Sequence, residues 1–396
     1  WDDDEKYINT IAWEYYVYDG EQVACDHNKQ CFGMKTVKPQ DKIITLNVPF
    51  AAVLNQIAPY GEWWGALVTD FLMSASKSQL FVELKIEELL WGGYNYNILK
   101  LLNATIQPGI PTDFALQPNA TNPQEARKMN NYQCDQFITG KENISEVGLY
   151  RKWKGQSVLD VWGSKEANTV GGTDGTGFRP NLDGSPVVGF VPGVFRKATL
   201  IKKEEITVEG IKLYSYILAK ENLVNASVDP AYYLYAPPGL LNITKAMNNT
   251  PVFISKPLFM DADPYYQNTV EFTNTKINAS IHETHLDTEP YTGLVMNGRK
   301  RIQINIRVKG TVTLFPKLKE LFFPIAWFEQ KATIGKEDAQ KFKDQVYFIK
   351  DALFYGQYII YGTSGLILIF SIIFLVIGVT RKTKRDSYDI IPGRIN

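Results

Sequence analysis

The sequence predicts an α+β protein, in which a large, mostly antiparallel domain with a helical cluster near its start precedes one membrane-spanning helix. Three observations support this fold class. An uncharged apolar run of membrane-spanning length stands near the end of the chain. Apolar residues at three- and four-residue spacing stand in the first quarter. The remainder holds strand-like runs with turn signals and no repeated strand–helix alternation, which argues against a parallel sheet.

The predicted membrane helix covers residues 358–379, YIIYGTSGLILIFSIIFLVIGV, which contain no charged residue. A helix rises 1.5 Å per residue, so roughly 20 such residues cross the ~30 Å hydrocarbon layer. RKTKR (381–385) follows the span, and the positive-inside rule assigns that end to the cytoplasm. The sequence therefore predicts a lumenal or extracellular region over 1–353 and a cytoplasmic tail over 380–396.

Composition restricts the partners. The chain has 396 residues with 42 basic and 42 acidic side chains. Zero net charge gives no reason to expect nucleic acid, whose phosphates select for clustered Lys and Arg. Because the chain begins at Trp1, we expect either that a leader was removed or that an N-terminal part is absent.

Glycosylation sequons and cysteines both bear on the outer region. The sequons all lie on the predicted outer side, which agrees with the charge rule; they are Asn103, Asn119, Asn143, Asn225, Asn242, Asn248 and Asn278. In an oxidising compartment Cys25 and Cys31 are close enough in sequence to form a disulfide across DHNKQ. Cys134 is left over, either buried and free or paired outside this segment.

The helical cluster is predicted over residues 49–92. FAAVLNQIA (50–58), WWGALVTDFLMSA (63–75) and LFVELKIEELLWGG (80–93) read as two or three short packed helices, with Gly92 and Gly93 ending the last.

Strands are predicted both before and after this cluster. Their runs are rich in β-branched and aromatic residues and cover 13–22, 42–48, 206–219, 251–254, 268–272 and 302–315. In the last, Ile302, Ile304, Ile306 and Val308 share one face, while Arg301, Gln303, Asn305 and Arg307 share the other. A helix over Lys336–Leu353 leads to the membrane.

The sequence motifs that would indicate catalysis are not supported by their context. GGTDGTGFRP (171–180) lacks the Lys of a Walker loop and the strand–helix context of a dinucleotide fingerprint. HETH (282–285) has a spacing of three instead of four between its histidines, which we interpret as exposed loop residues rather than zinc ligands. Paired acids such as Asp261 and Asp263, or Asp287 and Glu289, read as turn residues. We predict neither an enzyme, a metal site nor a cofactor.

The tail carries a candidate sorting signal, DSYDII. Tyr388 with Ile391 fits Y-x-x-apolar, and Asp386 with Ile390 and Ile391 fits an acidic dileucine-type signal. Both present apolar side chains that sorting adaptors bind in pockets. The alternative is an inert polar tail.

Several segments in order resemble the class B scavenger receptor and lysosomal integral membrane protein family. These are SKSQLFVELKIEELLWGGYN (76–95), GGTDGTGFRP (171–180), PVFISKPLFMDADP (251–264), THLDTEPYTGLVMNGRKRIQINIRV (284–308) and FPIAWFEQKATI (323–334). On this resemblance GGTDGTG is a scaffold turn whose glycines allow unusual backbone angles.

The resemblance implies an antiparallel β-barrel-like ectodomain with an apical helical bundle and an apolar tunnel leading toward the membrane. Members bind fatty acids, sterols, phospholipids or lipoproteins, or a lysosomal hydrolase at the apex, in lysosomal, endosomal or plasma membranes. The matching apical residues are Trp63, Trp64, Leu67, Phe71 and Lys77, which are equally compatible with bundle core or plain surface. Alternatively, the chain is a receptor or structural glycoprotein that binds a soluble protein through the apex.

The chain departs from the family pattern at several points. The family has two anchors, and the first is missing before Trp1. Gly171 replaces the usual Asn, Leu258 the usual His and Arg179 the first Pro. No Cys follows Cys134, so the family's later disulfide cluster is absent from this sequence.

Overall fold

The computed structural model describes residues 7–10, 40–57, 62–105, 113–116, 134–223, 238–247, 250–272, 275–309 and 320–388. These residues form two compact units. The first holds the described residues up to Val208 and those from Lys212 to Thr333, and the second holds Glu209–Ile211 and the chain from Ile334 to Tyr388.

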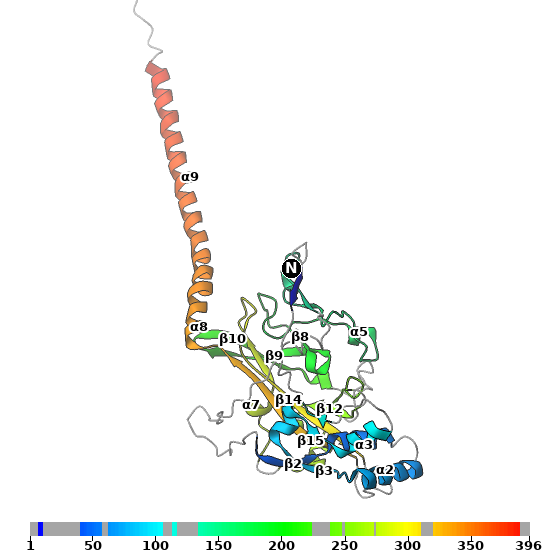
Figure 1. The fold of residues 1–396 in the computed structure, drawn as a ribbon. Helices are drawn as coiled ribbons and strands as arrows, with labels where there is room; N and C mark the ends of the chain where they lie inside the picture. The colour runs from blue at the N-terminus through cyan, green and yellow to red at the C-terminus, as the bar shows by residue number, and fades with distance from the viewer. Residues whose placement is uncertain are drawn as a thin grey trace, which may run out of the picture. The chain divides into compact units, whose positions relative to one another are not determined.

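An antiparallel sheet of eight strands dominates the first unit, in the order β11-β12-β14-β13-β10-β9-β8, with β15 paired to β14 (Figure 1). Its strands are β8 (Val187–Val191), β9 (Arg196–Val208), β10 (Ile211–Leu218), β11 (Leu241–Asn242), β12 (Val252–Ser255), β13 (His285–Thr288), β14 (Val295–Val308) and β15 (Leu321–Thr333). The antiparallel prediction is confirmed. Among the described strands, however, the sheet stays open and does not close into a barrel.

The smaller sheets are also antiparallel. They are formed by β1 (Tyr7–Thr10), β6 (Asp135–Ile138) and β7 (Tyr150–Lys152), by β2 (Lys42–Leu46) and β3 (Phe81–Lys85), and by β4 (Tyr94–Asn95) and β5 (Asp113–Phe114).

The predicted helical cluster is present as α1 (Val48–Ile57), α2 (Glu62–Ser76) and α3 (Asn97–Thr105). α2 packs against both α1 and α3. The helix predicted over 80–93 is wrong in its first half, because Phe81–Lys85 pairs with Lys42–Leu46 as β3. Only the turn that ends at Gly92 is helical, and Gly93 closes it at φ 75°.

Two strand predictions also need correction. The run 206–219 is divided by a turn at Glu209 and Gly210, whose φ values are 47° and 78°. The strand predicted at 268–272 is wrong, because α6 (Pro264–Thr269) occupies its first part. Asp263 caps this helix by accepting from the Tyr265 N–H at 2.8 Å, and Pro264 suits the first helical position.

The short helices and turns connect these strands. They are η2 (Glu88–Gly92), η3 (Ile144–Glu146), α5 (Lys165–Asn168), η4 (Pro192–Val194), η5 (Lys220–Leu223), η7 (Pro257–Phe259) and α7 (Ala279–His282).

β14 is covered on both faces. Ile306 and Val308 are buried in the core with α1, β2 and β12 residues, as the apolar face predicts. The opposite face is polar yet equally buried, since Arg301, Gln303 and Asn305 are 3%, 1% and 0% exposed. Strand alternation therefore identifies the two faces but not which of them is buried.

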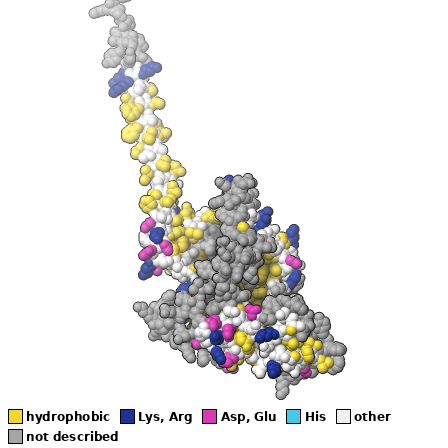
Figure 2. Space-filling view, in the orientation of Figure 1, with side chains coloured by type: hydrophobic (Ala, Val, Ile, Leu, Met, Phe, Trp, Pro, Cys, Tyr) yellow, Lys and Arg dark blue, Asp and Glu magenta, His cyan; other side chains and the backbone are white. Residues whose placement is uncertain are grey.

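The second unit is a helical rod formed by α8 (Lys336–Phe342), η8 (Lys343–Tyr347) and α9 (Phe348–Tyr388). It is long and apolar enough to cross a membrane. Figure 2 shows hydrophobic side chains along α9 and Lys and Arg at its far end. The predicted span 358–379 lies within this helix, which fits a membrane anchor.

Candidate functional site

A partly enclosed cavity of about 340 Å³ lies within the first unit. Most of its lining is apolar. The apolar lining residues are Phe190, Val191, Val194, Ala198, Leu200, Leu218, Leu223, Leu241, Ile254, Leu286, Val295, Ile302 and Ala332. This volume lies in the range of about 300–1,000 Å³ that is typical of small-molecule sites.

Strand register explains why these residues share one cavity. Gly298 pairs with Ala332 and Lys300 with Gln330 across β14 and β15, and all four line the cavity. Directly paired residues point to the same side of a sheet, and residues two apart along a strand do so as well. β13 adds Leu286, which pairs with Gly298 on the other edge of β14.

The charged residues of the lining are mostly basic. They are Arg196, Lys197, Lys256, Lys300 and Arg301, against one acid, Asp174. Arg301 is buried, and its Nε donates to a Glu329 carboxylate oxygen at 2.7 Å while its Nη1 donates to the Glu283 carbonyl at 2.6 Å. Arg196 is also buried and donates to the Asn222 carbonyl at 3.1 Å.

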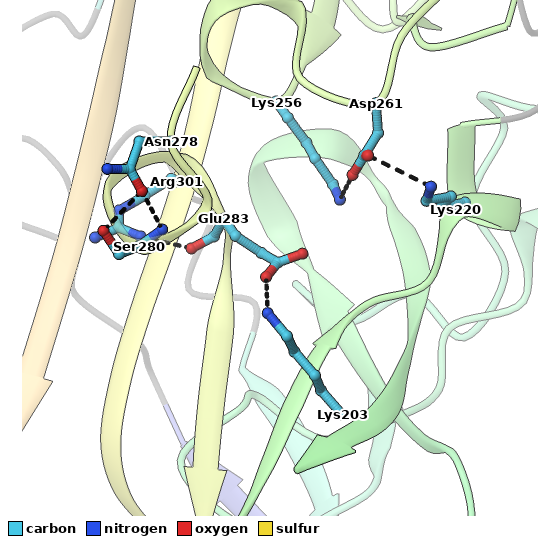
Figure 3. Close-up of polar contacts among 8 residues, drawn as sticks. All are labelled: Lys203, Lys220, Lys256, Asp261, Asn278, Ser280, Glu283 and Arg301. Carbon is cyan, nitrogen blue, oxygen red and sulfur yellow. Dashed lines mark hydrogen bonds and ion pairs between the residues drawn. The ribbon is translucent and has the colours of Figure 1, made fainter. Parts of the chain in front are cut away.

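Two acidic residues, Glu283 and Asp261, each pair with a lysine from a distant segment of the chain (Figure 3). Glu283 accepts from Lys203 of β9 at 2.9 Å, and this hydrogen bond raises the pKa of Lys203. Asp261 accepts from Lys256 at 2.6 Å and lies 3.5 Å from Lys220. Burial favours the neutral acid at Asp261, but the bonds and charges of Lys256 and Lys220 outweigh it and lower the pKa.

The GGTDGTG motif forms a turn, as predicted. Gly172 has φ 84°, and a Cβ at this position would fall 2.8 Å from the Gly189 carbonyl carbon of β8. The Asp174 carboxylate accepts from the Thr176 N–H at 2.9 Å and from its hydroxyl at 2.7 Å. Asp174, Gly175 and Thr176 also line the cavity, a role that the sequence reasoning missed.

The interpretation of HETH as exposed loop histidines is wrong. His282 ends α7 and is 3% exposed, and its Nδ1 accepts from the Asn278 N–H at 2.9 Å. His285 begins β13, with its Nε2 3.7 Å from Asp287. Asp287 is not a turn residue either, because it lies in β13 and is 1% exposed. No group of three or more metal-ligating residues occurs among the described residues.

These histidines predict a pH dependence of stability. Burial, supported by the Arg301 charge, lowers the pKa of His282, and burial also lowers that of His285 against the opposing effect of Asp287. The unfolded chain therefore takes up protons first, at about pH 6.5. Stability should be full above this pH and fall below it toward the folded-state pKa values.

The measurement is thermal unfolding of the purified protein between pH 7.5 and 5. The double variant His282→Gln/His285→Gln should lose less stability over this range than the wild type, since carboxylates contribute equally to both. An equal loss in the two proteins would show that neither imidazole is responsible.

The predicted apical residues lie on and just after α2. Leu67 is 47% exposed and Phe71 is 63% exposed, and Figure 2 shows hydrophobic side chains gathered there, at the lower right. Lys77 is exposed and has φ 51°. Trp63 and Trp64 belong to α2, but their side chains lie outside the described residues. Of this set, the described side chains of Leu67, Phe71 and Lys77 do not line the cavity.

The predicted modification sites are only partly described. Asn143 and Asn278 are exposed, and each side-chain oxygen accepts from the serine two residues later. Asn103 and Asn242 are half-buried. Cys134 is half-buried as well. Asn119, Asn225, Asn248, Cys25 and Cys31 lie outside the described residues.

The tail residues Asp386 and Tyr388 fall in the last turns of α9. Ile390 and Ile391 lie outside the described residues, and whether this segment is a sorting signal stays a prediction.

Comparison with known proteins finds a matching family model and several related membrane proteins. The model of the CD36 family matches residues 27–375. Scavenger receptor class B member 1 of Mus musculus is 29% identical over 74% of this chain and 57% of its own length. Lysosome membrane protein 2 of Homo sapiens is 27% identical over 86% of this chain and 67% of its own length. The chain thus spans between about half and two thirds of these relatives, and it belongs to the CD36 family.

Proposed function

We propose that this chain is part of a membrane scavenger-type receptor that binds lipid in the cavity and passes it toward the membrane. The observation that carries the proposal is the largely apolar lining of the 340 Å³ cavity. Transfer of each CH₂ out of water is worth about 0.8 kcal/mol, so a twelve-carbon segment contributes roughly 10 kcal/mol before the costs of binding. Water molecules would find few hydrogen-bonding partners along the apolar part of this lining.

The location is part of the same proposal. The uncharged helix with RKTKR beyond it supports a lumenal or extracellular first unit and a cytoplasmic tail. DSYDII and the name of lysosome membrane protein 2 favour endosomal and lysosomal membranes, and scavenger receptor class B member 1 favours the cell surface as the alternative. Glycans at the sequons and adaptor binding at the tail belong to this topology.

Native mass spectrometry of the detergent-purified chain tests the lipid proposal. We expect co-purified fatty acid, sterol or phospholipid in excess of an unrelated membrane glycoprotein prepared in the same way. Ala332→Trp places a large ring on the cavity lining and should reduce the bound lipid severalfold. Lys331→Trp, on the opposite face of β15, is the matched control. Equal lipid in both variants, or none above the glycoprotein, would reject the proposal.

The exposed apolar side chains of α2 favour a second function, the binding of a soluble protein through the apex. Leu67 and Phe71 provide the apolar surface, with Lys77 at its end. Pull-down with the purified chain should then lose its partner in the Phe71→Ser variant while the bound lipid stays unchanged. If the Phe71→Ser variant still captures the partner, this surface has no role in docking.

A further inference from the structure

Lys256 is a buried cation in an apolar setting. It follows β12 directly, lines the cavity, and its side chain is 3% exposed. The surrounding sequence, VFISKPLF, is otherwise apolar apart from one serine. Burial of an ammonium group costs several kcal/mol unless the charge is paired. A lysine at this position therefore needs an anionic partner.

A strained turn brings that partner to Lys256. Leu258, Phe259 and Asp261 all have positive φ, at 55°, 55° and 60°. The turn returns Asp261 to within 2.6 Å of the Lys256 ammonium, five residues earlier in the chain. Gln303 of β14 fixes the turn, because its side-chain oxygen accepts from the Leu258 N–H at 2.8 Å. The turn thus holds Asp261 against the ammonium of Lys256, a residue of the cavity lining.

Asp261 does not occupy all the hydrogen-bond donors of the Lys256 ammonium. An ammonium has three N–H donors, and Asp261 accepts one of them among the contacts of the described residues. Asp261 is also shared with Lys220, at 3.5 Å, as Figure 3 shows. Two cations, Lys256 and Lys220, thus share the single carboxylate of Asp261.

We propose that Lys256 is the specificity-determining residue of this cavity and holds the anionic headgroup of an amphiphile whose alkyl chain lies along the apolar lining. The inference rests on the proposed function and names the ligand class: a long-chain carboxylate or phosphate monoester in preference to a neutral ester or alcohol. A charge-assisted hydrogen bond is roughly twice as strong as a neutral one, so the same alkyl chain binds more tightly when it ends in an anion.

The test is binding of three sixteen-carbon ligands to the full chain in detergent: palmitate, hexadecyl phosphate and methyl palmitate. Lys256→Met keeps the side-chain length and removes the charge. We expect the affinity for both anions to fall about tenfold or more, with methyl palmitate within about threefold of wild type. Palmitate and the phosphate distinguish the two sources of the charge. The matched control is Lys220→Met, which removes the other cation on Asp261 without changing the lining.

Asp261→Asn tests the same idea in the opposite direction. It releases Lys256 from its partner, and the affinity for both anions should rise. If Lys256→Met does not fold, the double variant Lys256→Met/Asp261→Asn, which leaves no unpaired buried charge, is measured in its place. An equal change for anions and methyl ester, or no change, overturns the role of Lys256. If wild type binds none of the three ligands, the proposed lipid function itself fails.

Discussion

Replacing Gly293 by alanine will destabilise the first unit severely. Gly293 has φ 80°, which an L side chain rarely adopts, and a Cβ there would fall 2.6 Å from the Arg179 carbonyl oxygen and still closer to that of Phe178. Both atoms belong to the backbone and cannot rotate away. We expect a loss on the order of 4 kcal/mol or more, seen as a large drop in the yield of folded protein and in its melting temperature.

The contacts of this loop explain why it cannot move aside. The Gly293 carbonyl accepts from the Phe178 N–H at 2.8 Å, and the Pro290 carbonyl accepts from the Leu182 N–H at 2.7 Å. Any shift that relieves the alanine breaks these bonds. Gly193→Ala is the matched control, because no atom lies within 4 Å of its added Cβ. If the two variants have the same melting temperature, the close approach at Gly293 has no energetic importance.

Local sequence signals predicted those parts of the fold that depend on neighbours in the chain. α1 and α2 follow from apolar spacing, and the long helix follows from an uncharged run. The spacing of ELKIEELL predicts a helix, whereas the pairing of Phe81 with Leu46 makes the start of this segment the strand β3. Such a pairing joins segments 35 residues apart and leaves no local pattern.

The candidate site was predictable only in outline. The resemblance implies an apolar passage, and the structure contains a largely apolar cavity, but the described apical residues Leu67, Phe71 and Lys77 do not line it. Its lining comes from eight segments that register brings together. Lys256 offered one usable signal, a lysine inside an apolar run. The surroundings of His282 have no local signal, because Trp327 of β15 packs edge-on against its ring and the charge of Arg301 acts on it from β14.

The polar face of β14 leads to the second large effect, that of Gln303→Met. Gln303 is 1% exposed, accepts from the Leu258 N–H at 2.8 Å and donates to the Asn305 side-chain oxygen at 2.8 Å. Methionine fills a similar volume but leaves both groups buried without their partner. Each such group costs about 1–3 kcal/mol, so we expect the two together to lower the free energy of unfolding by about 2–6 kcal/mol.

Denaturant unfolding of Gln303→Met measures this loss, and Gln156→Met provides the same exchange at an exposed position outside the cavity lining. Since Gln303 also holds the strained turn that carries Lys256 and Asp261, the variant should in addition bind palmitate more weakly than Gln156→Met does. Stability equal to that of the control would mean that the network is replaceable by packing. If stability falls but palmitate binding does not change, the turn at Leu258 does not position the Lys256 ammonium for binding. The polar face of β14 would then serve the fold alone.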